Sequence, residues 1–132
     1  MLPRLDGRTA VVEIAAAKAA KLGIDQTAVR RIFEDQIAAN KAVQRSLHAR
    51  WQEQPTEQPT HRPSLTAEVR PIPDRVDRQL LTAVQKAQPL LSDTECRATL
   101  DRERSSTAKA MALDAIHRSG LDQSLAHTCQ TD

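Results

Sequence analysis

The sequence has little of what β-strands and tight turns require. Its 132 residues include three glycines, one phenylalanine, one tryptophan and no tyrosine. Residues that favour helices, such as alanine, leucine, glutamine, arginine and glutamate, are plentiful. This composition predicts an all-α fold. The length is that of a single domain, which argues against separate cofactor and substrate domains.

Long apolar runs and a dominant charge are also missing. No run is long enough to span a bilayer, and the first residues, 1–6, lack the apolar core of a signal peptide. Nineteen basic and seventeen acidic residues give a formal charge of +2, with the two signs interspersed. The sequence therefore indicates neither a membrane partner nor the strongly cationic face expected of a nucleic-acid-binding protein.

Helix-forming stretches and their stop signals predict four helices and a connector. Gly23 ends the first helix, and Asp25 is an N-cap for a long second helix. Five prolines predict a connector over residues 52–73. Ser92 begins a capping-box pattern ahead of the fourth helix, and Gly120 ends that helix. The predicted helices span residues 9–22, 27–51, 74–88 and 93–118.

Two amides interrupt an apolar line on the long helix. At 100° per residue, this line contains Phe33, Ile37, Asn40, Gln44, Leu47 and Trp51. Burying an amide without a partner costs about 1 to 3 kcal/mol. Asn40 and Gln44 therefore either form hydrogen bonds inside the bundle or line a pocket for a polar ligand. Gln36 lies at the edge of the line and is expected on a solvated flank.

Two arginines stand where a guanidinium can reach a ligand. Arg70 lies in the proline-rich connector just ahead of the third helix, from where it could bind a carboxylate bidentately across a groove. Arg8 precedes the first helix in a similar way. Most other arginines are expected on exposed helix faces.

A helix-turn-helix is a competing interpretation of the first two helices. In that interpretation Gly23 marks the turn, and Arg30 and Arg31 open a helix that reads DNA. A recognition helix is normally short and exposes its first turn, whereas this one carries an apolar line as far as Trp51. The pattern thus favours a helix of the core over a DNA-reading helix.

The residues that most often bind metals show no useful pattern. The four histidines, His48, His61, His117 and His127, lie far apart in the sequence and predict no metal site. The only cysteines are Cys96 and Cys129, which either pair or remain as buried thiols.

Three longer stretches carry a more specific signal. They are RIFEDQIAANKAVQRSLHARW at 31–51, SLTAEVRPIPDRVDRQLL at 64–81 and SDTECRATLDRERS at 92–105. Together they resemble the secreted, γ-class, all-helical chorismate mutases, and the likeness extends from Arg8 to Cys129. The resemblance implies a helical bundle around one long helix and a disulfide between Cys96 and Cys129.

The same resemblance implies an activity and a location. Such an enzyme isomerises chorismate to prephenate in the biosynthesis of phenylalanine and tyrosine, and needs no cofactor and no metal. It implies a periplasmic or secreted protein whose partner is this small-molecule substrate, with neither nucleic acid nor membrane involved. Whether the protein forms a homodimer is left open by the resemblance.

Four residues take roles from the resemblance. Asn40 falls at a hydroxyl-bearing position that contacts a carboxylate of the ligand, and Gln44 falls at the position that faces the ether oxygen. Arg70 and Arg8 match arginines that lie ahead of two of the helices and reach into the same pocket.

The resemblance also implies a first long helix that this sequence does not contain. That helix carries an arginine and a lysine, which clamp a carboxylate and the ether oxygen of the substrate. We therefore expect an N-terminally incomplete or degenerate chorismate mutase whose polypeptide has little activity by itself. The alternative is a non-catalytic helical interaction module that keeps the fold.

Overall fold

The computed structural model describes residues 7–59 and 71–130, and in these ranges it contains helices and no strand. The predicted all-α fold is confirmed. None of the described helices is long and apolar enough to cross a bilayer. The elements are α1 (Gly7–Lys21), α2 (Gln26–Glu53), the 3-10 turn η1 (Pro55–Glu57), α3 (Pro71–Leu91), α4 (Cys96–Ala110) and α5 (Ala115–Ser124).

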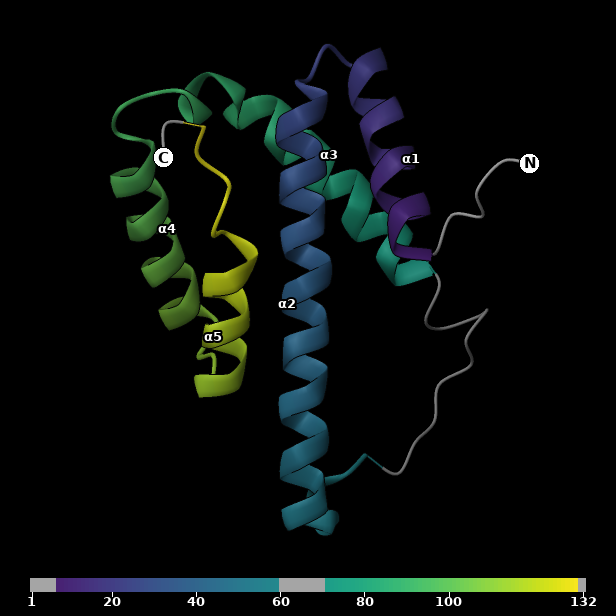
Figure 1. Ribbon diagram of the computed structural model, residues 1–132. Helices are drawn as coiled ribbons and strands as arrows, with labels where there is room; N and C mark the ends of the chain where they lie inside the picture. The colour runs from purple at the N-terminus through teal and green to yellow at the C-terminus, as the bar shows by residue number, and fades with distance from the viewer. Residues whose placement is uncertain (1–6, 60–70, 131–132) are drawn as a thin grey trace, which may run out of the picture.

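The long helix α2 is the axis of the bundle, and α1 and α5 pack directly on it (Figure 1). Helix α1 lies against its first half through small side chains, among them Ala15, Ala16 and Ala19, each at most 5% exposed. Small residues let the two backbones approach closely, so Val29 and Phe33 of α2 are almost completely buried. The core therefore sits at the N-terminal end of α2.

Helix α3 closes this core and holds the turn between α1 and α2. Its Leu81, Val84 and Leu91 belong to the buried cluster. The amide of Gln88 accepts a hydrogen bond from the backbone N–H of Asp25 at 3.1 Å, while Gln85 donates to the carbonyl of Leu22 at 3.3 Å.

The turn between the first two helices follows the sequence prediction. Gly23 has a φ of 72°, and the N–H of Ile24 donates to the carbonyl of Ala19 at 2.9 Å, which closes the end of α1. The carboxylate of Asp25 accepts the N–H of Thr27 at 3.0 Å and caps α2. Both predictions are confirmed.

The single helix predicted over 93–118 is wrong. The helix ends at Ala110 because Ala112 adopts a φ of 50° and the N–H of Leu113 donates to the carbonyl of Ala108 at 3.0 Å. This is the helix end that Gly23 makes for α1, formed here without glycine. Asp114 then caps α5 by accepting the N–H of His117 at 2.9 Å.

Both predicted boundary signals of that helix are wrong as well. Ser92 is not its N-cap, because Asp93 instead accepts the N–H of Glu95 at 2.8 Å and α4 begins only at Cys96. Gly120 does not end a helix, since it lies buried inside α5.

A disulfide joins the start of α4 to the end of the chain. Cys96 and Cys129 are bonded with an S–S distance of 2.00 Å, which confirms the pairing that the family resemblance implies. The two residues are 5% and 1% exposed. For their sequence separation of 33, the chain-entropy model gives a stabilisation of about 3.5 kcal/mol. Beside the disulfide, the N–H of Gln130 donates to the carbonyl of Leu91 at 2.7 Å.

Replacing Ala112 by glycine should stabilise the protein. A left-handed backbone conformation costs a residue with a β-carbon about 1 to 2 kcal/mol, and glycine avoids most of that. We expect Ala112→Gly to raise the free energy of unfolding by about 1 kcal/mol, measured by urea denaturation. The matched control is Ala98→Gly on the exposed side of α4, which should lower it by a similar amount. A loss of stability in Ala112→Gly would contradict the assigned turn.

Candidate functional site

The two amides of the predicted site are open to solvent. Asn40 and Gln44 are exposed, and neither side chain forms a hydrogen bond within the described part of the chain. The apolar line of α2 is thus buried only at its beginning: Phe33 is 2% exposed, Ile37 is half-buried and the amides follow. Within the described residues the amides are therefore not paired inside the bundle, and both are accessible to a ligand.

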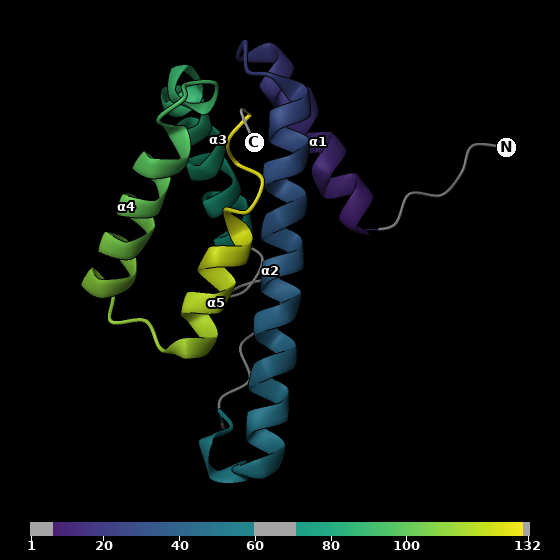
Figure 2. The same ribbon diagram turned by 60° about the vertical axis from the view of Figure 1, so that its left-hand side comes forward.

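The amides are exposed because α2 is longer than the helices that cover it. Helix α2 has 28 residues and α1 has 15, so the second half of α2 projects beyond α1 and α3 (Figure 1). The N-terminal ends of α1 and α3 lie at the same level along α2, near the middle of its length, in both Figure 1 and Figure 2. Two helix starts therefore flank the region where the covered half of α2 gives way to the open half.

Of the two candidate arginines, only Arg8 lies within the described residues. Arg8 lies in the first turn of α1, one residue inside the helix rather than ahead of it, and so at the level described above. Arg70 lies outside the described residues and directly precedes Pro71, the first residue of α3. The sequence positions of both arginines thus correspond to the helix starts that flank α2.

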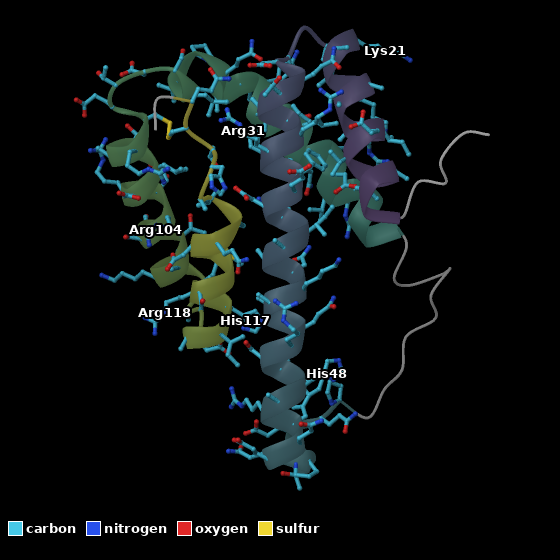
Figure 3. The ribbon with its side chains drawn as sticks, viewed as in Figure 1. Lys21, Arg31, His48, Arg104, His117 and Arg118 are labelled. Carbon is cyan, nitrogen blue, oxygen red and sulfur yellow. A yellow bond between two sulfur atoms is a disulfide. The ribbon has the colours of Figure 1, made fainter. Side chains whose placement is uncertain are left out.

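A groove beside Asn40 separates α2 from the turn of the α4–α5 hairpin. Its volume is about 310 Å³, and Gln44 does not line it. His117 lies between α5 and α2 (Figure 3), with its Nδ1 2.7 Å from the carboxylate of Asp114. The backbone N–H and the ring of His117 hold the pKa of Asp114 below its usual value. The remaining lining residues are Gln36, Ala39, Val43, Thr107, Met111, Leu113, Gly120, Leu121 and Ser124.

Comparisons with known proteins agree on one family. No family model matches the sequence. The chain is 31% identical over 107 residues to the secreted chorismate mutase of Mycobacterium tuberculosis, covering 81% of this chain and 53% of the relative. It is 27% identical over 125 residues to the secreted chorismate mutase of Mycolicibacterium smegmatis, covering 95% of this chain and 68% of that protein.

Two solved structures show which family the chain belongs to. The chorismate mutase of Burkholderia phymatum superposes with a TM-score of 0.86 at 33% identity, over 97% of this chain and 79% of that one. The chain belongs to the chorismate mutase family. The enzyme of Burkholderia thailandensis superposes equally well, with a TM-score of 0.86 at 29% identity, over 97% of this chain and 82% of that one. The chain spans about half the length of the mycobacterial relative first named above.

In this chorismate mutase family member, Gln36 is structural. It was expected on a solvated flank, but it is half-buried and donates to the carbonyl of Ser124 at 2.8 Å, so that expectation is wrong. One position earlier, the carboxylate of Asp35 accepts the N–H of His127 at 2.9 Å. These two contacts hold the end of α5 and the segment after it against α2. The sequence alone does not show this role, because the partner of Gln36 is a backbone carbonyl.

Of the two arginines in the helix-turn-helix interpretation, one forms an ion pair within the protein and the other is partly buried. Arg30 makes a two-pronged ion pair with Glu13 of α1, at 3.0 and 3.2 Å, and this lowers the pKa of Glu13. Arg31 is half-buried, with its Nε out of contact with solvent. The geometry thus argues against a DNA-reading helix. In the described ranges, no three histidine, cysteine or acidic residues gather as a metal site would require.

Substituting Gly120 should destabilise the protein although it lies in a helix. A β-carbon at this position would overlap with a methyl group of Val43, whose branched side chain has little rotamer freedom in a helix. We expect Gly120→Ala to lower the free energy of unfolding by about 1 to 3 kcal/mol, in contrast to the gain of about 1 kcal/mol that alanine usually brings to a helix.

A second substitution separates overlap from other causes. In a Val43→Ala background the overlapping methyl group is gone, so the further change Gly120→Ala should then be neutral or stabilising. Equal destabilisation in both backgrounds, measured by urea denaturation, would rule out contact between α2 and α5 at this point as the cause.

Proposed function

We propose that this chain binds chorismate and isomerises it to prephenate on the surface of α2 that carries Asn40 and Gln44. One observation carries the proposal: in a member of the chorismate mutase family, two amides lie exposed, with no partner among the described residues, on a helix face that is buried two turns earlier at Phe33. The donors and acceptors of an exposed amide are satisfied by water, which polar groups of a ligand can replace.

The reaction makes modest chemical demands on the protein. It is a unimolecular Claisen rearrangement, with no proton transfer and no covalent intermediate. Catalysis then consists of holding the substrate in a compact conformer and stabilising negative charge on the ether oxygen as its bond to carbon breaks. Neutral amides and guanidinium groups serve both purposes, and neither needs to titrate.

Each candidate residue has one role in this proposal. Gln44 donates its amide N–H to the ether oxygen, and Asn40 donates to a carboxylate of the substrate. Arg70 and Arg8 would bind the carboxylates, because a guanidinium matches a carboxylate with two parallel hydrogen bonds. Support comes from the level of the two helix starts along α2 and from the residue-by-residue resemblance.

We also propose that the protein works outside the cytoplasm. The two mycobacterial relatives are named as secreted, and the Cys96–Cys129 disulfide is of the kind that persists in oxidising compartments.

Binding of a transition-state analogue is the direct test of the site. We expect the oxidised protein to gain thermal stability with a bicyclic dicarboxylate analogue, since a ligand at 100 times its Kd adds about 2.7 kcal/mol to the folded state. A thermal shift reports binding directly and does not require turnover.

Matched variants assign the binding to the proposed surface. Asn40→Ala and Gln44→Ala should each reduce the thermal shift, while Ser46→Ala, an exposed position on the opposite side of α2, should leave it unchanged. If the folded protein shows no shift at any analogue concentration, the non-catalytic interaction module becomes the better explanation.

The pH dependence tests the role of Gln44. An amide does not titrate, so analogue binding should vary little between pH 5 and 8. In Gln44→Glu the side chain can donate only when protonated, and a free glutamate has a pKa near 4.3. The variant should therefore bind more weakly as the pH rises through this range, measured by isothermal titration. An unchanged, flat profile in Gln44→Glu would show that the residue does not face the ligand.

A further inference from the structure

Helix α1 is apolar on two sides, and the bundle covers only one of them. Its inner side, with Ala15 and Ala19, is buried against α2. On its outer side Val11, Ile14 and Leu22 are 40%, 56% and 47% exposed. Exposed apolar side chains that are neighbours on a helix often mark an interaction surface. The composition of α1 therefore suits a helix with a neighbour on its outer side.

The outer side of α1 forms one wall of a groove against α3. A cavity of about 380 Å³ lies between the two helices, and the side chains of Phe33 and Leu81 form part of its lining. A second cavity of about 360 Å³ shares Lys18, Arg78 and Leu81 with the first and reaches Leu22. From Val11 to Leu22 the groove follows α1 for about 16 Å, which is the length of some three helical turns.

The rim of this groove is cationic. Lys18 and Lys21 extend from α1, and Arg78 extends from α3. Figure 3 shows Lys21 at the C-terminal end of α1. None of these three side chains has an ion pair within the described residues. Among the described residues, Asp77 is the one acidic residue that lines the groove, and it already takes part in an interaction.

We propose that this groove binds an amphipathic helix of a partner, whose apolar stripe is flanked by acidic residues. The apolar lining between α1 and α3 fits the stripe, and the three cations fit carboxylates on both sides of it. A second copy of the chain fits poorly, because it would bring the same cations toward one another. A flat membrane surface also fits poorly, because the apolar groups lie in a concave groove and not on a protruding face.

The experiment selects binders without presuming a sequence. A displayed library of 18-residue peptides keeps a leucine stripe at helical spacing and varies the flanking positions between Glu, Gln and Lys. We expect selection on the folded, oxidised protein to enrich Glu at the flanks. The binding of an enriched peptide, followed by fluorescence anisotropy, should weaken at least tenfold between 50 and 300 mM NaCl.

Variants locate the peptide in the groove. Lys18→Glu/Arg78→Glu removes cations from the rim, and Val11→Ser/Ile14→Ser removes exposed apolar groups. Because all four side chains are exposed, both double variants should fold, as circular dichroism would verify. Each double variant should lower the affinity for the peptide at least tenfold. Lys41→Glu/Arg45→Glu makes the same charge change on an exposed part of α2 outside the groove and should change the affinity less than twofold.

Several outcomes would overturn the proposal. These are the enrichment of Gln or Lys at the flanks, the absence of any selected binder, and equal affinity in groove and control variants. A dimer in sedimentation that Val11→Ser/Ile14→Ser dissociates would assign the groove to a second copy. Binding to vesicles of anionic lipid that only the groove variants lose would assign it to a membrane surface. The chorismate site is tested separately, since Asn40 and Gln44 do not line this groove.

Discussion

The difference in length between α2 and its neighbours is the constraint on which the rest of the structure depends. A helix of 28 residues is about 42 Å long, whereas α1 with 15 residues covers about half of that. The apolar side chains Val29, Ile32 and Phe33 therefore concentrate where cover exists. Beyond them the same face carries amides, so the change from core to candidate site takes place along one line of one helix.

The second support of the bundle is the segment after α5, which runs back along α2. Asp35 holds His127 at 2.9 Å, and at the far end the side chain of Gln130 donates to Asp25 at 3.0 Å. The buried disulfide fixes α4 to this segment. Helix α5 packs directly on α2, whereas α4 is attached through α5 and the disulfide. The packing of α5 on α2, together with this attachment, therefore holds the α4–α5 hairpin in place and with it the groove beside Asn40.

The sequence predicts those features that depend on a residue's own chemistry. Gly23 and Asp25 end and begin helices in the usual way, and both positions were identified. The break at Ala112 was missed, because alanine carries no signal for a left-handed turn and its cost is met by the cap at Asp114. The burial of Gln36 was missed for another reason: its partner is distant in sequence and is a backbone group, which leaves no pattern to recognise.

The groove and the candidate site are connected through α2. Phe33 lines the groove, and Ile37, Asn40 and Gln44 follow it along the same face of the helix. A helix lying in the groove and extending past Phe33 would reach the side of α2 that is now exposed at the amides. Excluding water there would strengthen every hydrogen bond to a bound dicarboxylate, because electrostatic interactions grow as the local dielectric constant falls.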